Sequence, residues 1–225
     1  MSLQEKLSAF KARFQSGQPP FERVPSGVHD IMKRATDELV ASGAAARVRK
    51  SGPAPAFELK DADGQTVRLA DLLAKGPAVL SFYRGVWCPY CNIDLQELEH
   101  HADRIRATGA ALIAITPQTA ANSRKLIAQH KLTFPILSDP GNVVADRYGL
   151  RFRLPDYLVD LYKQLGVDLP AFNADSSWTL PMPARFVIDR QGQIRHAEAD
   201  PDYTRRPEPE GLLPVLQRLN SAATA

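Results

Sequence analysis

The sequence predicts an α/β domain with a mixed central sheet, preceded by an N-terminal helical extension. Two near-continuous apolar runs, 78–84 and 111–116, flank a stretch of helical periodicity, which is the pattern of a βαβ unit with parallel strands. Two later runs, 184–189 and 194–199, are separated by a Gln-Gly turn and predict an antiparallel hairpin at the edge of the same sheet. Before residue 50, apolar residues recur at helical spacing.

Composition and charge fit one globular domain with an extension. The chain has 225 residues, of which 44% are hydrophobic and 24% are charged, as in ordinary globular proteins. The formal net charge is +3 and the Lys and Arg residues are dispersed, which gives no support for nucleic-acid binding. Charged residues interrupt the N-terminal segment, and no stretch approaches the roughly 20 apolar residues of a membrane span. We therefore expect no secretory signal, no membrane partner and a cytoplasmic location.

Residues 1–50 are expected to form the helical extension, and residues 51–220 the main domain. Two helices are predicted in the extension, separated by a Gly-Gln-Pro-Pro break, and the second ends before Gly43. Their apolar positions are Leu3, Leu7, Phe10 and Phe14 in the first helix and Ile31, Ala35 and Leu39 in the second.

The main domain is expected to alternate between strands and helices. It opens with a β-hairpin around an Asp-Gly turn at 63–64, and it contains a helical insertion around 154–170. The other predicted elements are, in chain order, strand 78–84, a helix from Cys88 to Gly109, strand 111–116, helix 123–130, strand 134–137, a helix across 143–148, the hairpin 184–199 and a closing amphipathic helix 210–219.

Both cysteines of the chain, Cys88 and Cys91, are separated by two residues at a predicted strand-to-helix transition. C-x-x-C next to a βαβ pattern is a redox signature. Free backbone N–H groups and the positive end of the helix dipole stabilise a thiolate at this position, and Arg84 adds positive charge. Because the Pro-Tyr spacer keeps the second sulfur about one helical turn away, one cysteine can start a reaction and the other can resolve it.

A structural disulfide and a structural zinc site are both less favoured roles for the two cysteines. A disulfide across so short a loop contributes little stability. A structural zinc ion needs four ligands, and nine residues of helix place His100 about 13 Å from Cys91. We therefore expect no metal and no cofactor. Two unreactive buried cysteines remain the alternative, because Cys often behaves as a small core hydrophobe.

Four blocks of the chain resemble, in the right order, the alkyl hydroperoxide reductase and thiol-specific antioxidant branch of the thioredoxin superfamily, which includes the peroxiredoxins. The blocks are FELKDADGQTVRLADL, FYRGVWCPYC, FPILSDPGNVVADRYGL and ARFVIDRQGQI, and the resemblance spans about Pro53 to Leu219. It implies a thioredoxin-like three-layer fold and a peroxiredoxin-type oxidoreductase.

The resemblance leaves the roles of the two thiols open. The P-x-x-x-T-x-x-C box of peroxiredoxins lies on 84–91, where Arg84 replaces the proline and Cys88 the threonine. That register implies Cys91 as the peroxide-attacking thiol, with Asp94 as the acidic residue that such proteins often carry three positions later. The thioredoxin register instead implies Cys88 as the exposed nucleophile and Cys91 as the resolving thiol.

Four supporting residues also follow from the resemblance. Pro183 occupies the position of the peroxiredoxin arginine that polarises the peroxide, and it resembles the cis-proline beside the thioredoxin C-x-x-C. Arg185, two residues further on the same strand face, either replaces that guanidinium or is a solvated charge on an edge strand. Trp87 resembles the tryptophan before the thioredoxin C-x-x-C, although large aromatic residues more often only pack. Cys-Pro-Tyr-Cys, with Pro89 as spacer, is similar to the glutaredoxin motif.

The resemblance implies a thiol-dependent peroxidase with an antioxidant role, which reduces hydrogen peroxide or organic hydroperoxides through a thiol–disulfide cycle of Cys88 and Cys91. Thioredoxin or a glutathione/glutaredoxin system is the implied reductant, and a homodimer is the expected assembly. The first alternative is a protein disulfide or glutathione oxidoreductase without a peroxide step. A second alternative is a redox-sensing binding module, in which the disulfide alters an interface without turnover.

Overall fold

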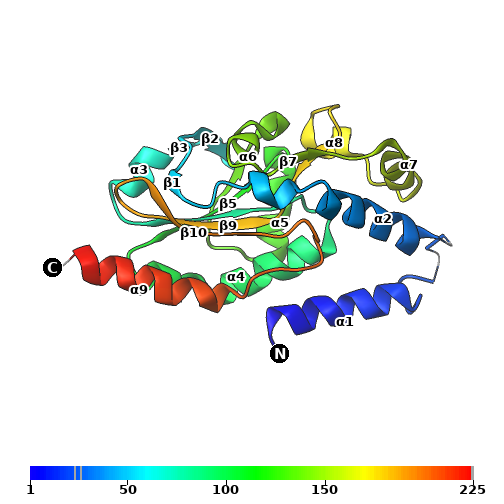
Figure 1. Ribbon diagram of the computed structural model, residues 1–225, viewed down its shortest axis with the longest axis horizontal. Coiled ribbons are helices and arrows are strands. Elements are labelled where there is room, and N and C mark those ends of the chain that lie inside the picture. Colours follow the sequence, from blue (N-terminus) through cyan, green and yellow to red (C-terminus); the bar gives the residue numbers. More distant parts are fainter. Residues whose placement is uncertain (23, 26, 224–225) are drawn as a thin grey trace.

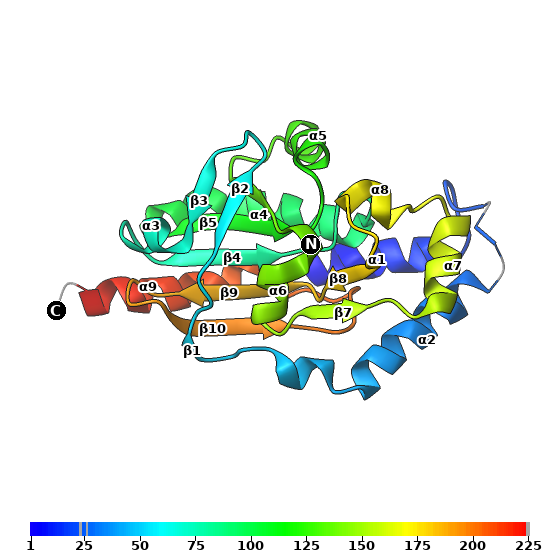
Figure 2. The ribbon, with the colours of Figure 1, turned by 90° about the horizontal axis from the view of Figure 1, so that it is seen from above.

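Helices cover both faces of a mixed sheet in the computed structural model, which describes residues 1–22, 24–25 and 27–223 (Figures 1 and 2). The strands are β1 Gly52–Pro53, β2 Glu58–Asp61, β3 Thr66–Arg68, β4 Ala78–Phe82, β5 Ala111–Thr116, β6 Ile136–Ser138, β7 Arg151–Arg153, β8 Thr179–Pro181, β9 Ala184–Ile188 and β10 Gln193–Ala199. The helices are α1 Leu3–Gln15, α2 Val28–Ala41, α3 Leu69–Leu73, α4 Pro89–Ala107, α5 Ala120–His130, α6 Val143–Arg147, α7 Asp156–Gln164, α8 Leu169–Asn173 and α9 Leu212–Ala223. Three short 3-10 turns are η1 Ala44–Arg47, η2 Pro140–Asn142 and η3 Pro209–Gly211.

The main sheet has the strand order β1-β10-β9-β4-β5-β6-β2-β3. Strand β4 pairs in parallel with β5, which pairs in parallel with β6, as the predicted βαβ unit requires. Strands β9 and β4 are antiparallel, with Ala78 opposite Ile188, and β2 and β3 form the predicted opening hairpin. These pairings confirm the mixed α/β sheet.

The core lies in two layers, one on each face of the sheet. Residues of β4 alternate between them, since Val79 belongs to the layer under α4 and α9, whereas Leu80 belongs to the layer under α3 and α6. All five residues of β4 are buried, which explains why its sequence is continuously apolar rather than alternating. A third, smaller apolar cluster joins α2, α7 and α8 at one end of the molecule (Figure 1).

Two expectations about the C-terminal half need correction. The hairpin formed by β9 and β10 was expected at the sheet edge, but β9 lies between β10 and β4. All five residues of β9 are buried, so its apolar run belongs to a central strand. The second, two-stranded sheet of β7 and β8 was not predicted, because strands of three residues carry almost no periodicity.

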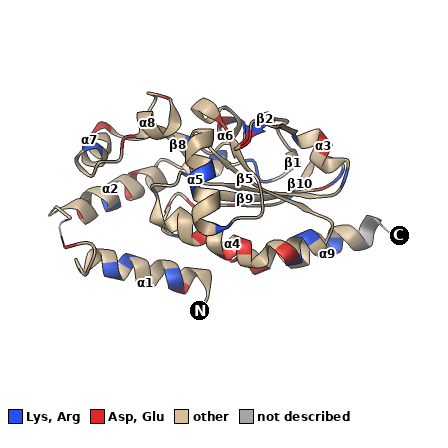
Figure 3. Ribbon diagram, turned by 180° about the vertical axis from the view of Figure 1, so that it is seen from behind, with Lys and Arg blue, Asp and Glu red and all other residues tan. Residues whose placement is uncertain are grey.

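The N-terminal helices are present where helical spacing predicted them, and they contact different parts of the domain. Leu3 and Leu7 of α1 are fully buried in the layer that contains α4. Figure 3 shows basic positions along α1 and acidic positions on the neighbouring part of α4, and Lys6 forms an ion pair with Glu97. Helix α2 instead packs on α7. Among the described residues, no helix is both long and apolar enough to span a membrane.

Candidate active site

The two cysteines mark the start of α4. Cys88 is the N-cap residue with extended backbone angles, Pro89 is the first helical residue, and Cys91 lies in the first turn. The chain reaches this point from β4 through Gly85, whose φ is +151°. A Cβ atom there would lie 2.5 Å from Nε1 of Trp87, so glycine lets the indole fold back against the loop.

Hydrogen bonds from neighbouring side chains fix the loop before Cys88. The backbone N–H of Val86 donates to Gln118 Oε1 at 2.8 Å, and Asn92 Nδ2 donates to the Val86 carbonyl at 2.9 Å. Gln118 Nε2 in turn donates to the Tyr83 hydroxyl at 2.9 Å. The loop is therefore held from α4 and from the residues after β5, which fixes the position of the first sulfur relative to the helix.

Both thiols are reduced and buried, with exposed fractions of 1% for Cys88 and 0% for Cys91. The expectation of an exposed first thiol is therefore wrong in this conformation. The reason is that segments far away in sequence cover the start of α4, among them α7 and the chain after β10. Their covering residues include Tyr162 and Tyr203, whose rings lie against Trp87 and Tyr90 respectively. A substrate must approach Cys88 through or between these residues.

Arg84 is the cation closest to Cys88. Its Nη1 lies 4.0 Å from the sulfur, and its Nη2 donates a hydrogen bond to the Tyr162 hydroxyl. The guanidinium carbon lies 4.2 Å from the ring centre of Tyr203 and 4.8 Å from that of Trp87. Within the described part of the chain, no carboxylate pairs with Arg84, so its positive charge is available to a thiolate.

Arg206 is the cation closest to Cys91. Its Nη2 donates to the Cys91 sulfur at 3.3 Å, and its Nε lies 3.3 Å from Oδ2 of Asp94. The other carboxylate oxygen of Asp94 accepts a hydrogen bond from Arg185. All three charged side chains are at least 97% buried, so Asp94 holds two buried guanidinium groups in place.

The pKa values of the two thiols diverge. Burial by itself raises the pKa of Cys88, but the Cys91 thiol and the guanidinium groups of Arg84 and Arg206 outweigh it and lower that pKa to about 6. Burial and the adjacent Cys88 thiolate raise the pKa of Cys91 well above its ordinary value. These directions favour Cys88 over Cys91 as the thiol that loses its proton first.

The structure brings most of the sequence-predicted site residues together. Arg84 and Trp87 contact the site directly, and Pro89 begins the helix. Pro183 lines the same narrow cavity as Arg84. Its peptide bond with Met182 is trans, which corrects the resemblance to a cis-proline, since the only cis peptide among the described residues is Pro19–Pro20. The chain runs directly from the end of β8 into β9 at this point.

Arg185 and Arg206 show where sequence reasoning was incomplete. Arg185 is not a solvated edge-strand charge, because it is 2% exposed and its guanidinium contacts Asp94. Arg206 was missed altogether, because it lies in an irregular segment after β10 and contacts a cysteine 115 residues earlier. A run of two arginines before Pro207 is the only local signal, and that pattern is common on surfaces.

A buried dithiol at the start of a helix that follows a central parallel strand defines a thiol-based redox protein of the thioredoxin-like class. Within the described residues, no group of three or more His, Cys, Asp or Glu side chains converges to hold a metal ion. The reactive groups that this arrangement supplies are the two cysteine sulfurs.

The family follows from comparison with known proteins. The model of the AhpC/TSA family matches residues 51–197, so the chain belongs to that family and is a peroxiredoxin-like protein of the thioredoxin superfamily. Chloroplastic peroxiredoxin Q of Triticum aestivum is 27% identical over 191 residues, which are 83% of this chain and 74% of that protein. The crystal structure of peroxidoxin BcpB from Mycobacterium tuberculosis superposes with a TM-score of 0.60 at 21% identity, over 76% of this chain and 98% of that one.

A shorter match relates the chain to another branch of the superfamily. The thiol-disulfide oxidoreductase ResA of Halalkalibacterium halodurans is 30% identical over 96 residues, which are 42% of this chain and 53% of ResA. The family match ends at residue 197, so Arg206 and both N-terminal helices lie outside it.

Proposed function

We propose that the chain is a thiol-dependent peroxidase in which Cys88 attacks the peroxide and Cys91 resolves the product. The observation that carries this assignment is the pKa of Cys88, which is lowered to about 6, while that of Cys91 is raised. The thiolate is the nucleophilic form of cysteine, so Cys88 is the reactive sulfur at neutral pH. This assignment follows the thioredoxin register of the motif rather than the peroxiredoxin register.

The reaction begins when the Cys88 thiolate attacks the terminal oxygen of a hydroperoxide. A sulfur–oxygen bond forms, the oxygen–oxygen bond breaks, and the leaving alkoxide or hydroxide takes a proton to become an alcohol or water. Arg84, near the sulfur, is positioned to stabilise the negative charge that moves onto the leaving oxygen. The Cys88 sulfenic acid then condenses with the Cys91 thiol, which yields a disulfide and one water molecule.

An external dithiol completes the cycle by reducing the disulfide and becoming oxidised itself. Membership of the AhpC/TSA family and the peroxiredoxin Q relatives support a hydroperoxide substrate and a thiol reductant. Our more specific proposal is that thioredoxin or a glutathione/glutaredoxin system supplies that dithiol. We also propose that residues 51–220 form the catalytic domain, with a helical insertion around 154–170 and an extension at 1–50. A cytoplasmic location and a homodimer stay predictions.

Single-cysteine variants test the assignment of the two sulfurs. With hydroperoxide and a thioredoxin-coupled reductant, Cys88→Ser should lose at least 1000-fold in turnover, because the attacking group is gone. Cys91→Ser should still consume one equivalent of peroxide and accumulate a Cys88 sulfenic acid, which mass spectrometry locates. A sulfenic acid on Cys91 in the Cys88→Ser protein, formed at the wild-type rate, would reverse the roles.

Access to the buried thiols is tested by alkylation of the native reduced protein. Iodoacetamide should modify Cys88 at pH 7 without denaturant, because a catalytic thiolate must be reached through local opening of its cover. If neither thiol reacts in the native state while both react in urea, the cysteines are structural and the proposed function is wrong.

A disulfide oxidoreductase without a peroxide step is the second candidate function. The dithiol motif and the match to ResA favour it. The two functions differ in the rate-limiting chemistry, so parallel assays with a hydroperoxide and with a model disulfide such as insulin distinguish them. Fast insulin reduction with slow peroxide consumption would support the second candidate and overturn the first.

A further inference from the structure

A hollow of about 350 Å³ lies where η1 and the residues after it meet α6 and the start of β7. We call it the arginine hollow, because its lining side chains are four guanidinium groups and one carboxylate. Neither cysteine lines it, and no aromatic or aliphatic side chain of a described residue does. The lining residues are Arg47, Arg49, Asp146, Arg147, Gly149 and Arg151.

Burial of alternate residues gathers the arginines of the hollow on one side of each segment. Val48 has extended backbone angles and is buried, so the exposed Arg47 and Arg49 both face away from the core. The second segment, 147–151, repeats the pattern, because its second and fourth residues are fully buried and the other three line the hollow. The core therefore leaves each segment one free face, and that face carries arginines.

Backbone contacts hold the two segments of the arginine hollow together. The backbone N–H of Arg49 donates to the Tyr148 carbonyl at 3.1 Å. Gly149 has a φ of +78°, and a Cβ atom there would lie 2.0 Å from the carbonyl oxygen of Arg47. Glycine permits both the left-handed backbone and this close approach. The backbone, rather than chance contacts of flexible side chains, therefore brings the arginines together.

The arginines of the hollow lack the partners that arginines elsewhere in the chain have. Among the described arginines, only Arg47, Arg49, Arg151 and Arg218 have no hydrogen bond, ion pair or ring contact from the side chain to another described residue. Three of these four line the same hollow. Elsewhere the fold satisfies its guanidinium groups internally, whereas here it leaves three of them free for a ligand.

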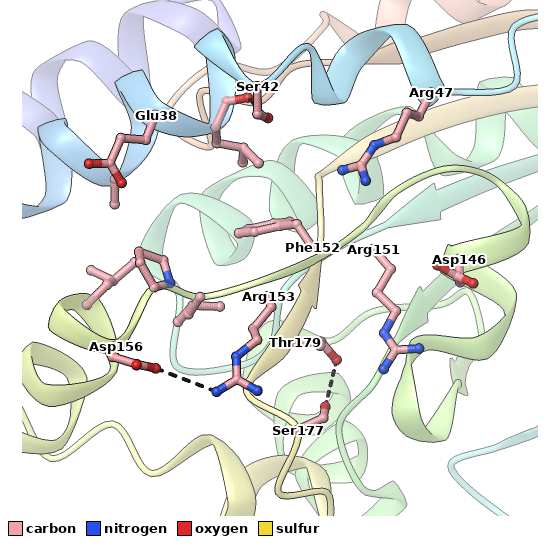
Figure 4. Close-up of a pocket in the computed structure, with 15 residues that line it drawn as sticks. Glu38, Ser42, Arg47, Asp146, Arg151, Phe152, Arg153, Asp156, Ser177 and Thr179 are labelled. Atoms are coloured by element: carbon pink, nitrogen blue, oxygen red, sulfur yellow. Dashed lines mark hydrogen bonds and ion pairs between the residues drawn. The ribbon is translucent and has the colours of Figure 1, made fainter.

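Carboxylates of the described residues do not neutralise the hollow. Asp146 is its single acidic lining residue, and it forms no ion pair with a described residue. Arg147 donates to a backbone carbonyl, which leaves its charge uncompensated. Figure 4 shows the contrast within β7, where Arg153 pairs with Asp156 but Arg151 does not pair with a residue of that view. Four arginines and one aspartate give the lining a formal charge of +3.

The composition of the lining identifies the kind of ligand that fits. Guanidinium groups bind phosphate oxygens through paired, charge-assisted hydrogen bonds, and an anion relieves the repulsion among crowded cations. A single phosphate has too few oxygens to bind four guanidinium groups in this way, whereas two linked phosphates have more. Because the lining offers no surface for a base to stack on or for a hydrocarbon chain, the fitting ligand is a compact polyanion.

We propose that the arginine hollow binds a diphosphate group, either free pyrophosphate or the diphosphate of a phosphorylated small molecule. Arg47 and Arg49 approach the ligand from one segment, and Arg147 and Arg151 approach it from the other. The first two arginines precede residue 51, where the family match begins, so the matched region contains only part of the site. The site does not depend on the proposed peroxidase function.

Calorimetry on the reduced full chain tests the site directly. At about 0.15 M salt, pyrophosphate should bind about tenfold more tightly than inorganic phosphate or sulfate, because those ions offer fewer oxygens. The Arg49→Gln/Arg151→Gln double variant removes one guanidinium from each segment and should bind pyrophosphate about tenfold more weakly. Arg218→Gln is the matched control, because it removes an exposed and equally unpaired arginine of α9, and it should bind as wild type does.

A gain of affinity and a thermal measurement separate loss of the site from loss of the fold. Asp146→Asn removes the acidic charge and should tighten pyrophosphate binding about threefold. Pyrophosphate should raise the Tm of wild type, because a ligand of the folded state stabilises it, and should not raise that of the double variant. Without ligand, the double variant should unfold at the wild-type Tm, because its two arginines have no partners among the described residues to lose.

Comparison with ADP distinguishes the two sources of the diphosphate. Binding of ADP as tight as that of pyrophosphate supports the diphosphate of a larger molecule, and exclusion of ADP with pyrophosphate binding retained supports free pyrophosphate. The proposal would be overturned if pyrophosphate bound no more tightly than phosphate or sulfate. Equal losses in the double variant and in Arg218→Gln would also overturn it, because binding would then reflect only the overall charge of the chain.

Discussion

The two sulfurs of the site lie within one turn of the same helix, yet their surroundings differ. Cys88 faces Arg84, which is held by a phenol and two aromatic rings and has no carboxylate partner in the described part of the chain. Cys91 faces Arg206, whose charge is shared with Asp94. Each thiol has its own guanidinium, but only one of these cations is free of a counter-ion.

This comparison shows that the partner of an arginine decides what the arginine does. A buried guanidinium next to neutral groups stabilises a nearby thiolate, whereas one that is paired with a carboxylate mainly fixes structure. The two sulfurs also compete for a single negative charge, because two adjacent buried thiolates repel each other. The hydrogen bond from the Cys91 thiol and the charges of Arg84 and Arg206 together favour that charge on Cys88.

The largest effect is expected from removing the carboxylate on the Cys91 side. Asp94→Asn leaves Arg185 and Arg206 buried without a counter-charge, so we expect a loss of about 3–5 kcal/mol in the free energy of unfolding. Urea unfolding of the reduced protein measures it. Asp103→Asn is the control on the same helix, because its side chain is 96% exposed, and a change of less than about 0.5 kcal/mol is expected. Equal effects of the two variants would show that the buried ion pairs do not hold this side together.

The pH dependence of stability should separate the two thiols. The folded-state pKa of Cys88, about 6, lies below the unfolded value of about 8.5, so its stabilising contribution is fully present above that unfolded value and is lost as the pH falls towards 6. The pKa of Cys91 is raised, so above about pH 8.5 folding is opposed as unfolded Cys91 ionises. Each slope is at most about 1.4 kcal/mol per pH unit.

Unfolding of reduced wild type and of Cys88→Ser between pH 5.5 and 9 measures this dependence. The stability difference in favour of wild type should grow from pH 6 to 8.5 and then decline, because the Cys88 thiolate raises the Cys91 pKa in wild type only. A difference that is constant over this range would mean that the Cys88 pKa is not lowered by folding.

Removing the unpaired cation should weaken the nucleophile. Arg84→Gln should raise the pKa of Cys88 towards that of an ordinary thiol, which reduces the thiolate fraction at pH 7 and slows alkylation by about tenfold to thirtyfold. Arg84→Lys, which keeps the charge, should lose less. If Arg206→Gln slowed the alkylation of Cys88 more than Arg84→Gln did, Arg206 rather than Arg84 would be the main cation that stabilises the Cys88 thiolate.

The smallest effect is expected from the phenol that orients Arg84. Tyr162→Phe removes the acceptor of a buried guanidinium hydrogen bond and should lower stability by about 1 kcal/mol, with a loss of a few fold in peroxide turnover. Tyr157→Phe is the control on the same helix, because its hydroxyl bonds to Glu38, away from the cysteines. A turnover loss of equal size in both variants would show that the orientation of Arg84 is not what matters.

Local sequence patterns were sufficient to predict the strand and the helix that carry the two cysteines. The apolar run before Cys88, the C-x-x-C spacing and the helical periodicity after it depend on neighbours in the chain, and β4 and α4 are found there. The opening hairpin and the parallel pairing of β4 with β5 follow from equally local signals. Sequence alone therefore determined the α/β class and the place of the dithiol in the fold.

Tertiary structure decided which cation lies beside each sulfur and how the two sulfurs are covered. Arg206 reaches Cys91 across 115 residues of sequence, and Arg185 reaches Asp94 across 91. Such contacts leave no periodic trace, because they depend on how distant segments cross rather than on the spacing within one of them. The burial of both thiols arises in the same way, because helices and loops that are distant in the sequence cover them in the folded chain.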